Sequence, residues 1–287
     1  MTKIGFMFGD EKLKLFRIAV LVVFIIVSLV FGVFFAKDKL TTDRTYPVIE
    51  FSDEELRVPS NADEEDFLKD VKAYDKKDGD LTDSIVIENI SKFSVLGTST
   101  ITYAVCDNDN HVSTAQRKVV FTDYKSPEFF MTKSLCFSIY DTVDVKGIVG
   151  AKDCIDGDIS NSVVVSSSDF ENGKVGKFAM KASVSNSKGD SIAIDLPLYV
   201  EDVDADVPKI KLKQYLIYVD KGTAVDYKKL LQSATDADGR NIASSVKVES
   251  EYDSKKSAEG VYSVHYYATD SAKRRGHTVL TIVVRSN

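Results

Sequence analysis

The chain has 287 residues, of which 44% are hydrophobic and 28% are charged, a composition that argues against a protein dominated by disorder. It holds 37 basic and 44 acidic residues. The first 36 positions contain four of the basic and two of the acidic residues, so the rest of the chain has 33 basic and 42 acidic residues and a net charge of −9. An acidic chain without a basic stripe argues against a nucleic-acid partner and against adsorption to anionic lipid.

The first predicted element is a transmembrane helix over residues 18–36. These nineteen residues carry no charge, and at about 1.5 Å per helical residue they cover roughly the 30 Å hydrocarbon core of a bilayer. A cleaved signal peptide is the competing interpretation, but it needs small residues at its end, whereas this segment ends in Val33-Phe34-Phe35-Ala36. We therefore expect an uncleaved signal anchor, preceded by a cytoplasmic segment over 1–17 and followed by a linker over 37–46.

Basic residues on the two sides of the span predict its orientation. Four precede the span and three follow it: Lys3, Lys12, Lys14 and Arg17 against Lys37, Lys39 and Arg44. The margin is thin, but the segment before the span is too short to fold, and everything foldable lies after it. We expect a single-pass protein of the cell membrane with its N-terminus in the cytoplasm and its repeats extracellular.

Behind the span, the same sequence pattern occurs three times. Each copy opens on a proline and continues with an Asp-rich turn, a strand that starts at a glycine, and a polar turn residue ten positions later. The prolines are Pro47, Pro127 and Pro208, the glycines are Gly97, Gly176 and Gly260, and the turn residues are Asp107, Asn186 and Asp270. A fixed interval of about 80 residues indicates duplicated modules, which we place at 47–123, 127–203 and 208–287.

Short stretches of alternating polarity predict an all-β fold, with three tandem Ig-like β-sandwich domains after the helix. Short helical turns are expected at 63–70 and 225–233, and short spacers predict end-to-end stacking of the modules into a rod. The inward positions of the glycine-led strands are Ser99, Ile101, Tyr103 and Val105, then Phe178, Met180, Ala182 and Val184, then Tyr262, Val264, Tyr266 and Ala268. The intervening residues, such as Thr100, Thr102, Lys177, Lys181, Ser263 and His265, should face water.

This combination resembles the bacterial Ig-like surface repeats first noted in pesticidal crystal proteins, which are similar in style to hyalin repeats. The third unit carries the strand motif as GVYSVHYYATD from Gly260, and the first as GTSTITYAVCD from Gly97. The second unit keeps the turn DCIDGD but its strand departs from the motif, as GKFAMKASVSN from Gly176. The resemblance covers residues 47–287 and implies accessory modules of an exported or surface-attached bacterial protein, with the ligand left open.

The Asp-rich turns are the strongest candidate for a site. Three carboxylates fall within six residues in each of the first two units: Asp75, Asp78 and Asp80, then Asp153, Asp156 and Asp158. Such oxygen-rich loops suit Ca²⁺, although the spacing differs from that of an EF-hand and the third unit has Arg240 after Asp236 and Asp238. The alternative, which we favour, is a tight turn whose carboxylates cap backbone N–H groups. We accordingly expect no cofactor, with weak calcium binding as the alternative.

Residues for catalysis are few, so we expect a protein that is not an enzyme. His111, His265 and His277 show no paired metal-ligand spacing, and the sequence has neither a G-x-S-x-G elbow nor a phosphate-binding glycine loop. On its outward position, His265 is expected to be a solvated or edge residue. A Cys136–Cys154 disulfide is conceivable in an exported domain, with free thiols as the default.

A surface patch formed by Tyr267, Lys273, Arg274 and Arg275 is a candidate contact for an anionic partner, because its cations reverse the sign of the acidic ectodomain. The sequence therefore predicts a membrane-anchored bacterial surface protein that acts in adhesion, ligand binding or spacing, with an unidentified protein or glycan ligand. The alternative is a structural or accessory subunit of a larger cell-envelope assembly.

Overall fold

The computed structural model describes residues 7–41, 44–166, 170–171 and 173–286. Lys3, which enters the prediction of orientation, lies outside these ranges. The chain divides into two compact units: the first comprises Met1–Asp53, Asp70–Glu88 and Thr102–Gln116, and the second comprises Glu54–Lys69, Asn89–Ile101 and Arg117–Asn287. This division does not follow the predicted module boundaries, which stay a prediction.

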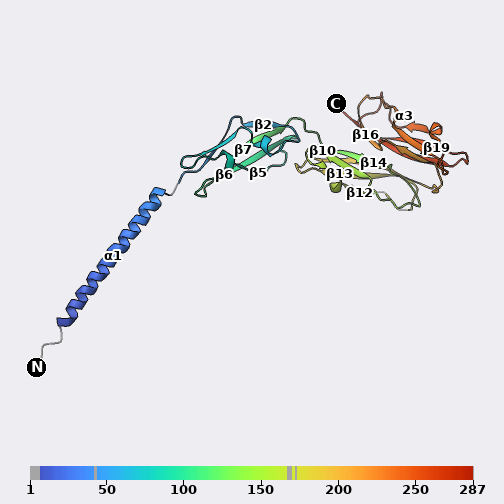
Figure 1. Cartoon of the computed structure of the whole chain (residues 1–287). Coiled ribbons are helices and arrows are strands. Elements are labelled where there is room, and N and C mark those ends of the chain that lie inside the picture. The colour runs from blue at the N-terminus through green and yellow to red at the C-terminus, as the bar shows by residue number, and fades with distance from the viewer. Residues whose placement is uncertain (1–6, 42–43, 167–169, 172, 287) are drawn as a thin grey trace. The chain divides into compact units, whose positions relative to one another are not determined.

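The predicted N-terminal helix is present as α1, Met7–Thr41, and is longer than the expected span (Figure 1). Its segment Lys12–Lys39 has a mean hydropathy of 3.2, and none of it is buried against the rest of the chain. By length and composition this helix is able to cross a membrane. A signal sequence near an N-terminus has the same character.

The rest of the described chain is mostly β-strand, and the first repeat supplies two sheets. One is antiparallel, in the order β1-β3-β4, and the other has the order β2-β7-β6-β5. The strands of the first sheet are β1 Val48–Phe51, β3 Val71–Asp75 and β4 Gly79–Asp80. Those of the second are β2 Glu55–Val58, β5 Val86–Ile90, β6 Thr98–Cys106 and β7 Val112–Phe121.

The second repeat has the same plan, with sheets β11-β10-β8 and β12-β13-β14-β9. The strands of the smaller sheet are β8 Glu128–Met131, β10 Val149–Asp153 and β11 Gly157–Asp158. Those of the larger sheet are β9 Cys136–Ser138, β12 Val164–Ser166, β13 Gly176–Ser185 and β14 Ser191–Glu201.

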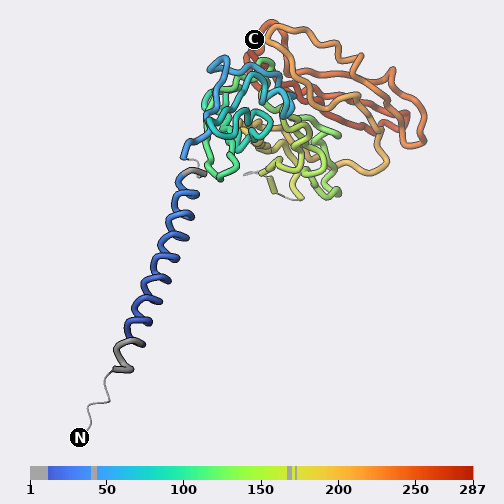
Figure 2. Tube along the Cα trace, turned by 60° about the vertical axis from the view of Figure 1, so that its left-hand side comes forward, coloured from blue at the N-terminus to red at the C-terminus, as the bar shows by residue number. Residues whose placement is uncertain are grey.

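The third repeat pairs β15 with β17 and has a four-stranded sheet in the order β16-β20-β19-β18. Its strands are β15 Lys209–Leu212, β16 Leu216–Asp220, β17 Leu231–Thr235, β18 Lys247–Ser250, β19 Gly260–Thr269 and β20 Arg275–Arg285. Figure 2 follows the long back-and-forth segments of this repeat in orange and red. The expected helical turns are present as α2 Glu64–Leu68, which Asp63 caps, and α3 Tyr227–Leu230, which Asp226 caps.

Each four-stranded sheet contains one parallel pair, which the sequence patterns did not predict. β2 pairs with β7, β9 with β14, and β16 with β20, and in every case the early edge strand of a repeat lies beside its last strand. Because this arrangement occurs in all three repeats, it supports their origin by duplication. The predicted fold class, tandem Ig-like β-sandwiches after one N-terminal apolar helix, is confirmed.

The predicted alternation of the glycine-led strands is confirmed on the inward side except at Tyr262, which is half-buried. Tyr103 and Tyr266 are fully buried, and the Tyr266 hydroxyl donates to the carbonyl oxygen of Tyr227 at 3.0 Å. On the outward side the prediction fails at Ser263, which is only 1% exposed. His265 is half-buried and also departs from the solvated position expected for it.

These departures have one cause, which is that the third repeat packs against the second within the second unit. Leu216 of β16 belongs to the same buried cluster as Phe129 and Leu198 of the second repeat. The amide of Phe129 also donates to the Tyr218 hydroxyl at 2.8 Å, and the amide of Val279 donates to Ser134 Oγ at 2.9 Å. The expected end-to-end stacking is therefore wrong for these two repeats, because apolar and ring side chains on the outward face of the third sheet are covered by the second.

Candidate functional site

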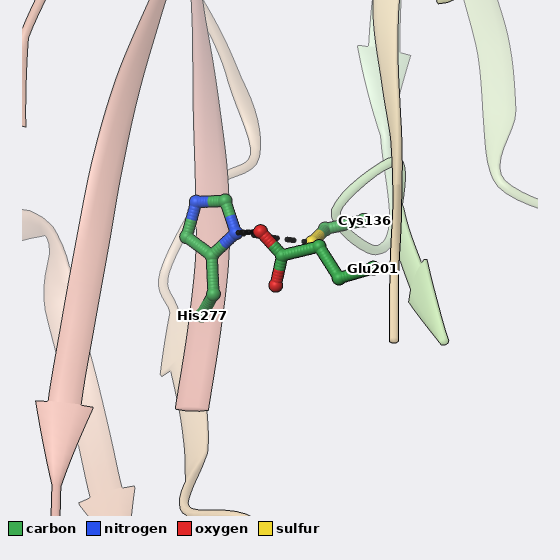
Figure 3. Close-up of side chains that lie close together, drawn as sticks. All are labelled: Cys136, Glu201 and His277. Atoms are coloured by element: carbon green, nitrogen blue, oxygen red, sulfur yellow. Dashed lines mark hydrogen bonds and ion pairs between the residues drawn. The ribbon is translucent and has the colours of Figure 1, made fainter. Parts of the chain in front are cut away.

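The candidate site lies where the second and third repeats meet. Among the residues that the structure describes, Cys136, Glu201 and His277 form the one group of three potential metal ligands whose atoms all lie within 4.8 Å of one another. Cys136 begins β9 and Glu201 ends β14, and β9 runs parallel to β14 with Cys136 opposite Tyr199. Figure 3 shows these two side chains approaching from one side and His277, on β20, from the other.

Both ring nitrogens of His277 have partners. Nδ1 lies 2.7 Å from Oε1 of Glu201 and 3.3 Å from Sγ of Cys136, while Nε2 lies 2.9 Å from Nδ1 of His265. His265 and His277 have no paired metal-ligand spacing in the sequence, but they come together because β19 and β20 are neighbouring strands.

Aromatic rings enclose the site on the side of the third repeat. The Tyr267 ring stacks on His277 with centroids 4.5 Å apart, and the Arg275 guanidinium lies 3.7 Å from the centroid of Tyr267. As a result the His277 side chain is only 4% exposed, whereas that of Glu201 is 33% exposed and provides a route to solvent.

Burial and neighbouring charges set the protonation of the site. Burial, with a smaller contribution from the charge of Glu201, raises the pKa of the Cys136 thiol to about 12, so the thiol is neutral at neutral pH. The hydrogen bond from His277 holds the pKa of Glu201 below its ordinary value. Burial, and then the neighbouring His277, lower the pKa of His265. The thiolate, not the thiol, is both the nucleophile and the metal ligand, so Cys136 takes either role only when a cation or a base removes its proton.

The predicted Asp-rich turns lie elsewhere, and their carboxylates accept hydrogen bonds from backbone amides. Oδ1 of Asp75 accepts from the amides of Lys77 at 2.7 Å and Asp78 at 3.0 Å. In the second repeat, Oδ1 of Asp153 accepts from the amides of Ile155 at 2.8 Å and Asp156 at 2.9 Å. The turns thus have the capping contacts of the structural alternative.

The other carboxylates of each triplet bind different parts of the repeat. Asp78 accepts from the amide and side chain of Asn108, and Asp156 does the same with Ser187. Asp80 and Asp158 accept from the amides of Thr82 and Ser160, at 2.9 and 3.0 Å, and side-chain hydrogen bonds from the same two residues are the main cause that lowers the pKa of each carboxyl. Calcium binding at these turns stays an untested prediction.

The residues of the predicted contact patch have different partners, and their joint contact with a ligand stays a prediction. The Tyr267 ring stacks on His277, and the Arg275 guanidinium lies against the Tyr267 ring. Arg274 instead donates through Nε to Oδ2 of Asp270 at 2.8 Å, and Lys273 is exposed in the turn at φ 64°.

The conceivable Cys136–Cys154 disulfide is absent, because both thiols are free and have separate partners. Sγ of Cys154 donates to the carbonyl oxygen of Lys125 at 3.2 Å.

The site at Cys136 was missed because its three residues are spread over two repeats and have no motif spacing. The available signal was weaker: outward alternation places His265 and His277 on the same face of adjacent strands.

Comparisons with known proteins leave the family open. No family model matches the chain. A stretch of 136 residues, 47% of the chain, is 29% identical to an uncharacterized 81.3 kDa protein of Acholeplasma phage L2, and the match spans only 18% of that protein. The specific repeat type therefore stays a resemblance.

Two solved structures show how distant the structural similarity is. One holds the M60 catalytic domain with the CBM51-1 and CBM51-2 domains of Clostridium perfringens ZmpB, at 16% identity and a TM-score of 0.24, covering 86% of this chain and 31% of that one. The other is Drosophila N-cadherin EC1-4, at 12% identity and a TM-score of 0.23, covering 85% and 77%. TM-scores this low do not support a fold assignment, so we assign the fold from the sheets themselves.

Proposed function

We propose that this protein is a single-pass envelope protein of a bacterium that holds its β-sandwich repeats outside the cell, where they bind a ligand or act as spacers. The observation that carries the proposal is α1, whose apolar segment Lys12–Lys39 is nowhere buried by the chain and precedes all of the sheets. An uncovered apolar surface of this length is stable in lipid and unfavourable in water. The four basic residues before the span, against three after it, favour a cytoplasmic N-terminus.

Protease protection tests the topology. The full chain, with a tag at each end, is expressed in bacterial cells and the membranes are washed with alkaline carbonate. The expected result is that the chain stays in the membrane, that external protease removes the C-terminal tag from intact cells, and that the N-terminal tag is protected. A chain found in solution after loss of its first 36 residues would show a signal peptide instead and would overturn the proposal.

For ligand binding, we propose that an anionic partner contacts Lys273 and Arg275, which are the exposed cations of the predicted patch. Arg274 contributes less because its charge is paired with Asp270. Retention of anionic glycans or acidic proteins by the full chain in detergent is expected to fall in the double variant Lys273→Asn, Arg275→Gln and to persist in Lys174→Asn. Asparagine tolerates the positive φ at position 273, and Lys174 is an exposed lysine elsewhere. Equal retention by all three proteins would refute the proposal that Lys273 and Arg275 bind the ligand. If the chain instead co-purifies with a stoichiometric membrane partner, the alternative function, a subunit of a larger cell-envelope assembly, is favoured.

A further inference from the structure

We propose that Cys136, Glu201 and His277 form a binding site for a divalent transition-metal ion of the zinc class, and that the bound ion links the second repeat to the third. Thiolate sulfur, imidazole nitrogen and carboxylate oxygen are the ligands that zinc takes in proteins. Here they come from β9, β14 and β20, and their atoms all lie within 4.8 Å of one another.

The distances between ligand atoms nearly match those that a tetrahedral ion requires. With bonds of about 2.0 to 2.3 Å, zinc sets its nitrogen and oxygen ligands about 3.3 Å apart and its nitrogen and sulfur ligands about 3.6 Å apart. In the structure, His277 Nδ1 is 2.7 Å from Glu201 Oε1 and 3.3 Å from Cys136 Sγ. The ion therefore needs Nδ1 of His277 to move away from Oε1 of Glu201 by about 0.6 Å and from Sγ of Cys136 by about 0.3 Å. Glu201 is able to make that movement, because it ends its strand and is one-third exposed.

A second independent observation is the orientation of His277. Metal-binding histidines are typically held by a hydrogen bond at the nitrogen that does not face the metal. His265 Nδ1 makes this contact with Nε2 of His277 at 2.9 Å, and the stacked Tyr267 ring fixes the ring plane. Nδ1 is left directed at Cys136 and Glu201.

The charges of the site balance on binding. Zn²⁺ forms a bond to Cys136 Sγ and the thiol proton leaves to solvent, so the thiolate and the Glu201 carboxylate together neutralise the ion. His277 binds as a neutral imidazole through Nδ1, with its proton on Nε2 directed at Nδ1 of His265. The Arg275 charge also acts on Glu201 and opposes the ion. We therefore expect weaker binding than at a four-cysteine site. Three protein ligands leave a fourth position for water.

Cobalt is the spectroscopic probe for this site. The metal-free full chain in detergent is titrated with Co²⁺, and one equivalent is expected to give thiolate-to-cobalt charge-transfer absorption together with the visible bands of a tetrahedral ion. Zn²⁺ should then displace the cobalt. Cys136→Ser and His277→Gln are expected to lose the signal, whereas Cys106→Ser and His111→Gln, which alter a thiol and a ring outside the site, should keep it.

Thermal unfolding of the wild-type chain tests metal binding even if some of the variants fold poorly. Zn²⁺ is expected to raise the melting temperature of the wild-type chain and to leave that of Cys136→Ser unchanged, since an ion that binds only the folded state stabilises it. Each variant is also melted without metal to show that it is folded. The proposal is overturned if the wild-type chain gives no thiolate–cobalt band, or if Cys136→Ser binds cobalt as tightly as the wild type does.

Discussion

The Tyr199 hydroxyl in β14 donates a hydrogen bond to Oγ of Ser263 in β19 at 2.8 Å. Ser263 is 1% exposed, and its amide also donates to the carboxylate of Glu251 at 3.1 Å. Lys177 in the second repeat pairs with the same carboxylate at 3.3 Å. The outward face of the third repeat is thus joined to the second by a chain of polar contacts beside the Cys136 site.

Replacing Tyr199 by Phe tests how much the hydrogen bond between Tyr199 and Ser263 contributes to the free energy of unfolding. The change leaves the buried Ser263 hydroxyl without the donor it has in the structure, and an unsatisfied buried polar group costs about 1–3 kcal/mol. We expect the free energy of unfolding, measured by urea denaturation of the full chain in detergent, to fall by that amount. Tyr140→Phe is the matched control, because that hydroxyl donates to Asp202 at an exposed position, and it should cost less than about 0.5 kcal/mol. Equal losses in the two variants would contradict the prediction.

Leu198→Ala is expected to be among the more damaging changes in the second repeat. Leu198 is fully buried in the cluster shared with the third repeat, and emptying such a position costs about 2–5 kcal/mol in lost burial and a residual cavity. Val164→Ala, on a strand of the same sheet at 63% exposure, should change the free energy of unfolding by less than about 0.5 kcal/mol. Urea denaturation measures both, and a loss below about 1 kcal/mol at Leu198 would show that this core is loosely packed.

Local patterns were sufficient to predict the fold class. Strand alternation has a period of two, so the inward positions of Tyr103 and Tyr266 follow from the sequence alone, and both side chains are fully buried. The helical turns were predictable for the same reason, since Asp63 and Asp226 are local capping signals. Each of these features depends on residues close together in the chain.

The site depends on contacts between distant residues, which local patterns do not encode. Ser263, His265 and Tyr267 alternate with core residues and have the polarity of a solvated face, so the sequence predicts exposure. Instead, the second repeat covers that face and brings Cys136 and Glu201 to His277, which lie 141 and 76 residues away in the chain. Neither the parallel edge strands nor this packing has a signature in spacing or composition.

Acid should destabilise the second repeat through Asp158. The Ser160 side chain and then its amide donate to this carboxyl and hold its pKa below the ordinary value. The unfolded chain therefore takes up the proton first as the pH falls. The stability contributed by Asp158 is fully present above the unfolded pKa of about 4, and is lost as the pH falls through the lower folded pKa.

The measurement is the melting temperature of the full chain as a function of pH between about 5 and 2. Ser160→Ala and Asp158→Asn should each give a shallower decline than the wild type, because each removes the interaction that separates the folded and unfolded pKa values. Ser162→Ala alters the same turn without touching Asp158 and should keep the wild-type slope. If the melting temperature of Asp158→Asn falls with pH as steeply as that of the wild type, this carboxyl is excluded as a source of acid sensitivity.

Gly276→Ala tests how closely the start of the third repeat packs on its last strand. A Cβ at Gly276 would lie 1.9 Å from the carbonyl oxygen of Pro208 and 2.7 Å from its carbonyl carbon, and both are backbone atoms. Backbone cannot swing aside as a flexible side chain can, so the strand or the Pro208 segment must shift. Overpacking of this kind costs about 1–3 kcal/mol, and we expect urea denaturation to show that loss. Gly147→Ala is the control, since a Cβ there meets nothing within 4 Å, and its effect should stay within about 0.5 kcal/mol. If both variants are equally stable, the proline that opens the repeat is free to move away from β20 at little cost.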